Sequence, residues 1–102
     1  MLTVRQWNLY QLLSWPEWIS GRDLSKIYKQ RVGKEISYGS VYVNMSRLVE
    51  AKWAEIFDTE DRGGRVRFYR RNPQGDRPQK PERLTAREAR FDPVGILLPE
   101  RT

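Results

Sequence analysis

Residues 37–51 carry the strongest periodic pattern in the sequence. Apolar or aromatic side chains recur there at helical spacing, at Tyr38, Val41, Tyr42, Met45, Leu48 and Val49. This spacing predicts an amphipathic helix that is buried along one side, and Ser37 has the side chain of a helix N-cap. We assign Tyr42 and Met45, and Trp53 just beyond the helix, to the hydrophobic core. The rest of the chain must supply the elements that cover this stripe.

The opposite side of the same helix carries Ser40, Val43, Asn44 and Arg47 in place of the Glu and Lys of an ordinary solvated helix. Small polar groups beside an arginine suit the edges of base pairs in the major groove of DNA. Asn44 and Arg47 have the hydrogen-bonding groups that read adenine and guanine, respectively. The alternative is a core helix of a small domain whose outer side lacks acids.

A first helix is predicted over residues 3–14. Its apolar stripe is broad and consists of Val4, Trp7, Leu9, Tyr10, Leu12 and Leu13. Thr3 is the expected N-cap, and Pro16 ends the helix. A stripe of this breadth indicates either a central position in the domain or a subunit interface.

A second helix is predicted over residues 21–32. Ser20 is its expected N-cap, with Asp23 three residues later as in a capping box, and Gly33 suits the left-handed residue that ends a helix. The residues expected to be buried are Leu24, Ile27 and Tyr28. A helix, a short turn with glycine and a second helix form a helix-turn-helix candidate, in which the second helix contacts DNA.

After Ala51 the pattern changes from helical to alternating. Residues 53–59 and 65–70 predict two strands. Residues 61–64, Asp-Arg-Gly-Gly, predict a hairpin turn because glycine allows positive φ angles. Residues 18–19 predict one short additional strand. The order of elements predicts a mainly α fold with a small β-hairpin (α+β), namely a winged helix-turn-helix with three helices and a two- to three-stranded wing.

The second predicted strand and its turn are rich in arginine, at Arg62, Arg65, Arg67, Arg70 and Arg71. Alternation places Arg65 and Arg67 on the same face as Tyr69, and we expect Val66 and Phe68 to point toward the core. Guanidinium groups on a wing pair with phosphates or enter the minor groove. The alternative is a solvated edge strand that charge protects against aggregation, although lysine would serve that purpose equally well.

The composition limits the classes of function. The net charge of +6 and the pI near 10.0 favour a polyanionic partner. The chain has no cysteine and no histidine, which removes disulfides, thiolate metal sites, the usual zinc ligands and histidine-based catalysis. We therefore expect neither an enzyme nor a cofactor or metal. No apolar run is long enough to span a membrane and no signal peptide is recognisable, so we expect a cytoplasmic protein.

The sequence predicts two parts, a winged-helix DNA-binding domain at residues 1–72 and a proline-rich extension at residues 73–102. The extension contains Pro73, Pro78 and Pro81, followed by a possible short helix over residues 84–91 that Pro93 limits. Its apolar residues, at positions 94–98, should pack against the domain or in a dimer.

The motifs of the third helix and the wing resemble those of the PadR-like winged-helix transcriptional regulators. The resemblance covers roughly residues 5–75 and rests on Ser37, Tyr38, Gly39, Ser40, Val41, Tyr42 and Leu48, and on Arg65, Tyr69 and Gly75 in the wing. Two departures limit it. Lys52 stands where the family usually has glycine, and Pro78, Pro81 and Pro93 leave little room for the family's long C-terminal dimerisation helix.

The candidate DNA-binding residues are Ser37, Tyr38, Gly39, Ser40, Asn44 and Arg47 on the helix, Arg62, Gly64, Arg65 and Arg67 in the wing, and Lys26 and Lys29 on the second helix. Gly39 would let a phosphate approach the helix N-terminus closely. Ser37 either contacts DNA or only caps the helix, and Tyr38 either reaches a phosphate or covers the helix start. Lys26 and Lys29 are either phosphate contacts or solvated charges.

The function predicted from these residues is sequence-specific binding of double-stranded DNA by a transcriptional regulator, a repressor or autoregulator. We expect a homodimer, formed through the first helix and the apolar end, because palindromic operators suit two-fold proteins. No small-molecule effector is evident, and no membrane association is expected. The alternative is a winged-helix protein-interaction or assembly module with a basic surface.

Overall fold

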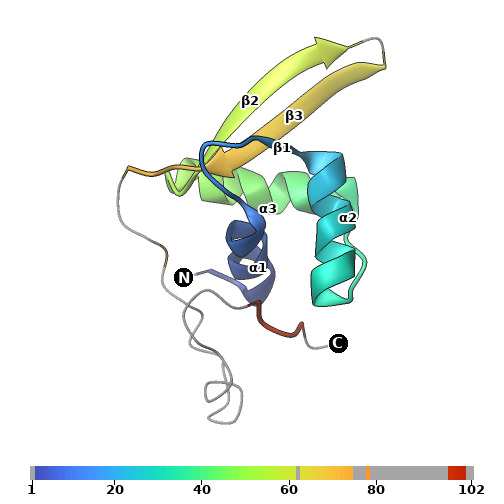
Figure 1. Cartoon of the computed structure of the whole chain (residues 1–102), viewed down its shortest axis with the longest axis vertical. Coiled ribbons are helices and arrows are strands. Elements are labelled where there is room, and N and C mark those ends of the chain that lie inside the picture. The colour runs from blue at the N-terminus through green and yellow to red at the C-terminus, as the bar shows by residue number, and fades with distance from the viewer. Residues whose placement is uncertain (1, 62, 75–77, 79–96, 101–102) are drawn as a thin grey trace.

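The computed structural model describes residues 2–61, 63–74, 78 and 97–100. Three helices, α1 (Val4–Leu12), α2 (Gly21–Val32) and α3 (Tyr38–Glu50), precede the hairpin of β2 (Ala54–Asp61) and β3 (Gly64–Arg71). A short strand, β1 (Ile19–Ser20), completes a three-stranded antiparallel sheet in the order β1-β3-β2. The hairpin extends away from the three helices (Figure 1). The predicted α+β winged-helix fold is confirmed.

Local hydrogen bonds explain where the helices begin. The side chains of Thr3, Ser20 and Ser37 each accept a hydrogen bond from the backbone N–H three residues later, at 3.1 Å. Thr3 N–H also donates to the side chain of Gln6 at 3.1 Å, which completes a capping box. Gly33 ends α2 in the left-handed conformation, with φ of 82°. These caps satisfy backbone groups that have no partner inside the helix.

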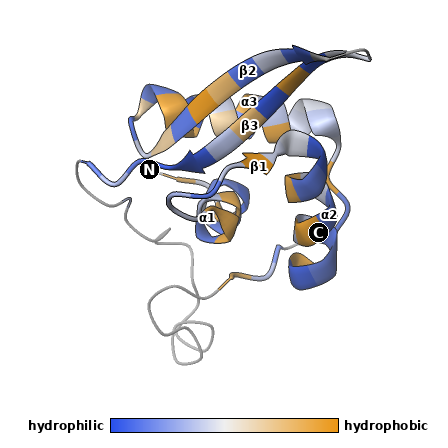
Figure 2. Cartoon of the chain, turned by 45° about the horizontal axis from the view of Figure 1, so that its top comes forward, coloured by the Kyte–Doolittle hydropathy of each residue, from blue (hydrophilic) through white to orange (hydrophobic). Residues whose placement is uncertain are grey.

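The core lies where the three helices meet the inner face of the sheet. α1 is central to it, because five of its residues, Gln6, Trp7, Asn8, Leu9 and Tyr10, are buried. α2 contributes Leu24 and Tyr28, and α3 contributes Val41, Met45 and Leu48. Figure 2 shows the hydrophilic side of α2 turned outward. The broad stripe of α1 thus follows from a central position within one chain.

The faces of the hairpin are opposite to the sequence-based expectation. Tyr69 lies on the inner face and is 1% exposed, and burial raises its pKa to about 12. Phe68 lies on the outer face with Phe57 and Trp18, at centroid distances of 6.4 Å for Phe57–Phe68 and 5.9 Å for Trp18–Phe57. Both faces of β3 carry an aromatic residue, so alternation alone could not show which one is buried. The prediction that Phe68 points to the core was wrong.

Opposite charges face each other along the hairpin. Glu55 pairs with Arg70 and Asp58 with Arg67 in the strand register, with N···O distances of 3.4 and 3.5 Å. Cross-strand pairs of opposite charge stabilise a register, and a shift by one residue would move every side chain to the other face. The acids of β2 therefore help to hold the arginine-rich strand in place.

Asn8 connects α1 to the far end of the chain. Its side-chain Nδ2 donates to the carbonyl of Leu98, and the N–H of Leu98 donates to its Oδ1, both at 2.6 Å. Asn8 is completely buried and Leu98 is 2% exposed. The predicted short helix over residues 84–91 lies outside the described residues. The division of the chain at residue 72 stays a prediction.

Lys52 adopts a left-handed backbone conformation, with φ of 65°. This residue follows α3. It stands at the position where the PadR-like family, which the sequence resembles, usually has glycine. The side chain of an L-amino acid makes this conformation unfavourable by about 1–2 kcal/mol, whereas glycine adopts it freely. The backbone geometry of the turn thus explains a glycine preference that this chain does not follow.

Replacing Asn8 by alanine should lower the free energy of unfolding by about 2–4 kcal/mol, because the buried backbone groups of Leu98 would lose both partners. Asn72→Ala is the control, since the Asn72 side chain bonds the Lys52 carbonyl at an exposed site. Urea unfolding of both variants measures the difference. A loss for Asn8→Ala no larger than that for Asn72→Ala would contradict the structural role of Asn8.

Lys52→Gly should raise the free energy of unfolding by about 1 kcal/mol, because glycine has no Cβ and adopts the left-handed conformation without a steric clash. Gly33→Ala is the reciprocal control, since its φ is also positive and an added Cβ would meet nothing within 4 Å. That variant should lose a similar amount. Thermal or urea unfolding measures both, and a destabilised Lys52→Gly protein would count against the proposed strain.

Candidate nucleic-acid interface

The exposed side of α3 is formed by aromatic and apolar residues and one arginine, namely Tyr38, Tyr42, Val43 and Arg47. Tyr42 is 43% exposed, so its assignment to the core was wrong. Met45 is completely buried, as predicted, and Trp53 is partly buried against the core. The exposed surface is therefore rotated around the helix axis relative to the predicted one. We call these four residues the α3 strip.

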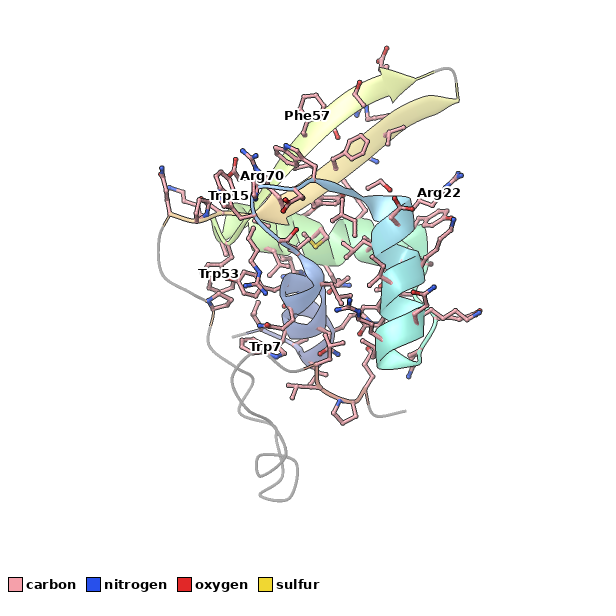
Figure 3. All side chains as sticks on the ribbon, viewed as in Figure 1. Trp7, Trp15, Arg22, Trp53, Phe57 and Arg70 are labelled. Atoms are coloured by element: carbon pink, nitrogen blue, oxygen red, sulfur yellow. The ribbon has the colours of Figure 1, made fainter. Side chains whose placement is uncertain are left out.

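Arginines from two other elements flank the α3 strip. The guanidinium carbon of Arg22, at the start of α2, lies 5.9 Å from the centre of the Tyr38 ring. That of Arg67, on β3, lies 4.3 Å from the centre of the Tyr42 ring. Arg22 is labelled in Figure 3 at the end of α2 that points toward the wing. A cation above an aromatic face is attracted by the ring electrons, so these contacts place positive charge on both sides of the strip.

Ser40 and Asn44 lie beside the α3 strip and are only partly exposed. Asn44 Nδ2 donates to the backbone carbonyl of Ser40 at 2.7 Å and to its hydroxyl at 3.3 Å. Arg5 Nη1, from α1, donates to the same hydroxyl at 3.1 Å. The polar groups that sequence analysis placed toward a groove are thus engaged within the protein.

The arginines of β3 have different environments. Arg65 is exposed, and Arg67 pairs with Asp58. Arg70 lies between the rings of Trp15 and Trp18, at 4.2 and 4.1 Å from their centres. Figure 3 shows Arg70 and Trp15 close together at the base of the hairpin.

Arg71 turns back to α1, where its Nε donates to the carbonyl of Tyr10 at 3.2 Å and its Nη2 to that of Gln11 at 3.3 Å. A cation there is favourable because the carbonyls at a helix C-terminus carry partial negative charge. Arg70 and Arg71 thus stabilise the fold. Among the described wing arginines, Arg67 contacts Tyr42 of the α3 strip and Arg65 is exposed. Arg62 lies outside the described residues.

The other described residues that were predicted to bind DNA are exposed, but they belong to different elements. Ser37 and Gly39 are exposed at the N-terminus of α3, and Gly64 is exposed at the hairpin turn. A Cβ on Gly39 would meet only the Ser37 hydroxyl, at 4.0 Å, so the packing of this chain does not require glycine there. Lys26 is exposed on α2.

Lys29 forms an exposed ion pair with Glu35 at 2.9 Å, which raises the pKa of Lys29 and lowers that of Glu35. Lys26 is therefore better suited than Lys29 to meet an external phosphate. The sequence indicated neither Arg22 nor Tyr42 as part of this surface, and it placed Val43 on the outer side of the helix without making it a candidate contact. The only signal for Arg22 was its place in the first turn of α2, two residues after the N-cap Ser20, where a side chain can extend past the helix end.

The described residues contain no group of three acidic side chains that could hold a metal ion. In the same part of the chain, every helix is too short or too polar to cross a membrane. The features that the structure does offer are the α3 strip, its flanking arginines and the exposed turn of the hairpin.

Comparison with known proteins identifies the fold. Neither protein-family models nor curated proteins match this sequence. Among solved structures, a PadR family transcription regulator from hypervirulent Clostridium difficile R20291 is similar with a TM-score of 0.53 and 16% identity, over 67% of this chain and 72% of that chain. Bacillus subtilis PadR in complex with operator DNA is similar with a TM-score of 0.60 and 16% identity, over 89% of this chain.

The match to Bacillus subtilis PadR spans 59% of that protein's length. At 16% identity the similarity establishes a shared fold. The resemblance seen in the sequence motifs is thereby confirmed at the level of the fold, and both similar proteins are transcription regulators.

Tyr42→Ala should lower the free energy of unfolding by less than about 1.5 kcal/mol, because Tyr42 is 43% exposed and leaves no closed cavity when it is shortened. Met45→Ala, three residues later on the buried side, should lose about 2–5 kcal/mol through the cavity it leaves. Urea unfolding of the two variants separates these expectations. Equal losses would mean that Tyr42 is packed in the core after all.

Proposed function

We propose that this chain is a transcriptional regulator that binds double-stranded DNA, with α3 in the major groove and the wing beside it. The observation that carries the proposal is the α3 strip, flanked by Arg22 and Arg67, on a fold shared with a PadR protein solved on its operator. The net charge of +6 favours approach to a polyanion. We propose further that binding is sequence-specific and that the protein acts as a repressor or autoregulator by occupying its operator.

Each residue of the α3 strip has a matching group on DNA. Arg47 can form two hydrogen bonds with guanine, and the side chain of Val43 can pack against a thymine methyl group. The hydroxyls of Tyr38 and Tyr42 can reach phosphates. The absence of a Cβ at Gly39 would let a phosphate approach the positive end of the helix dipole. Ser37 directly precedes α3, and Lys26 lies one helical turn after Arg22 on α2, so we include both among the proposed contacts.

Acidic residues of β2 compensate part of the positive charge on the wing, so we expect few of its arginines to contact phosphates. Asp58 already compensates Arg67, and Glu60 stands opposite Arg65 in the strand register. We therefore propose Arg65 as the main contact of the described part of the wing, to a phosphate or within the minor groove, with Gly64 allowing close approach. Each phosphate neutralised contributes about 0.9 to the slope of log K against log salt.

We also propose a homodimer, and the burial of α1 limits which of its residues could contribute. Trp7, Leu9, Tyr10 and Leu98 are buried within one chain, whereas Val4 and Leu12 are only partly buried. The buried residues would have to leave the core before they could contact a second protomer. A two-fold assembly on a palindromic operator would therefore use the partly buried residues of α1 or other surfaces.

A protein-interaction role is the second candidate, and the outer face of the hairpin favours it. Trp15, Trp18 and Phe57 are substantially exposed there. Figure 2 shows a hydrophobic stretch in the middle of β2. Exposed apolar patches often mark contacts with other proteins. This face lies on the side of the sheet opposite the buried Tyr69, so it could act alongside DNA binding.

Selection of binding sites from random double-stranded DNA, followed by mobility shifts at two salt concentrations, tests the proposal. We expect one enriched sequence, bound in preference to unrelated DNA at both salt concentrations. Binding that shows no sequence preference and disappears at moderate salt would favour the protein-interaction role.

Variants then assign the contacts. Arg47→Ala should reduce discrimination at one base pair by about 1–3 kcal/mol. Arg65→Ala should weaken binding to all sequences equally and lower the salt slope by about 0.9. Arg31→Ala is the control for net charge, because Arg31 is exposed in the last turn of α2. An Arg47→Ala protein with unchanged discrimination would contradict the proposed orientation of α3.

A further inference from the structure

The segment of residues 97–100 ends in an ion pair with α1. Glu100 Oε1 lies 2.7 Å from Arg5 Nε. The side chain of Glu100 is 10% exposed and that of Arg5 is 30% exposed. Two residues earlier, the Leu98 backbone is held by both hydrogen bonds of Asn8. Figure 1 shows this segment lying against α1, far in sequence from the winged-helix elements that it touches.

Arg5 connects this ion pair to α3. Its Nη1 donates to the hydroxyl of Ser40, in the first turn of α3, while its Nε donates to Glu100. The backbone carbonyl and the hydroxyl of Ser40 in turn accept hydrogen bonds from the side-chain amide of Asn44. A continuous set of polar contacts therefore runs from the 97–100 segment through α1 to the helix that carries the α3 strip.

The burial of Glu100 distinguishes this contact from an ordinary surface ion pair. Exposed pairs such as Lys29–Glu35, with side chains 63% and 81% exposed, contribute little. Glu100 has a second oxygen, Oε2, that is buried and has no hydrogen-bond partner. The hydrogen bond with Glu100 also raises the pKa of Arg5. A carboxylate that is this deeply buried needs a cation beside it, because water cannot stabilise its charge there. Glu100 therefore holds the guanidinium of Arg5 in one orientation.

The Tyr28 hydroxyl lies in the same region. It too is buried without a hydrogen-bond partner, and burial raises its pKa to about 12. Arg5 thus lies between the buried carboxylate of Glu100 and the first turn of α3. Its planar guanidinium can donate hydrogen bonds in two fixed directions at once, which a lysine ammonium does less well.

We propose that Glu100 and Arg5 are positioning residues for DNA recognition: Glu100 orients the guanidinium of Arg5, which holds Ser40 and so sets the first turn of α3. This inference rests on the proposed function, since the turn that Ser40 occupies also carries Tyr38 and Gly39. Residues 97–100 thereby influence which surface α3 presents, although they lie outside the predicted DNA-binding domain of residues 1–72.

The test compares Glu100→Gln, Arg5→Lys and Glu35→Gln in the full chain. Glu100→Gln and Glu35→Gln remove the same charge, but only the first lies in the proposed set of contacts. We expect the ratio of affinities for the selected operator and for unrelated DNA to fall about tenfold in Glu100→Gln and in Arg5→Lys, as for the loss of one charge-assisted hydrogen bond. The ratio should be unchanged in Glu35→Gln.

The direction of the effect excludes a simple charge explanation. Removing Glu100 makes the chain more basic, which by itself strengthens binding to all DNA. A lower ratio with undiminished binding to unrelated DNA therefore supports positioning. A reduced free energy of unfolding with an unchanged ratio would mean a purely structural role and would overturn the proposal.

Amide hydrogen exchange of free protein provides a readout that does not depend on DNA. The amides of residues 40–44 should exchange about tenfold faster in Glu100→Gln than in the wild type. Exchange equal to that of Glu35→Gln would refute positioning. If the wild-type protein selects no operator, the proposed function fails, and the exchange rates still decide whether Glu100 and Arg5 order α3.

Discussion

The structure depends on the burial of α1. Its residues contact the other two helices, and Asn8 at its centre is a polar side chain with no exposure, which is possible only because Leu98 satisfies both ends of its amide. Arg71 bonds the carbonyls at the end of the same helix. Since buried polar groups need partners, α1 fixes where the end of β3 and the 97–100 segment must lie.

With α1 at the centre, the arginines of β3 acquire separate roles. Arg71 completes a helix end, and Arg70 fills the space between two tryptophan rings beside Glu55. Only Arg65 and Arg67 remain for an external polyanion among the described wing arginines. Part of the arginine-rich strand β3 therefore serves to stabilise the fold. The acids of β2 stand opposite Arg65, Arg67 and Arg70 in the strand register and compensate part of this charge.

The candidate interface is composite. α3 contributes the strip, α2 contributes Arg22, and β3 contributes Arg67. Two of the polar residues expected on the strip, Ser40 and Asn44, instead form hydrogen bonds with each other, and the Ser40 hydroxyl also accepts a hydrogen bond from Arg5. Through Arg5, Ser40 connects the first turn of α3 to α1. The surface that would meet a groove is consequently more aromatic than the sequence pattern indicated.

The sequence by itself determined the order of the elements, the caps at Ser20 and Ser37, the left-handed end at Gly33 and the helix-turn-helix with its wing. These features depend on residues within a few positions of each other, so local hydrogen bonds and backbone preferences decide them. Only the tertiary structure decided that Tyr42 is exposed and that Tyr69, not Phe68, is buried. β3 carries aromatic side chains on both faces, and the tyrosines of α3 stand next to its apolar stripe. Only packing against the other elements selects which side is covered.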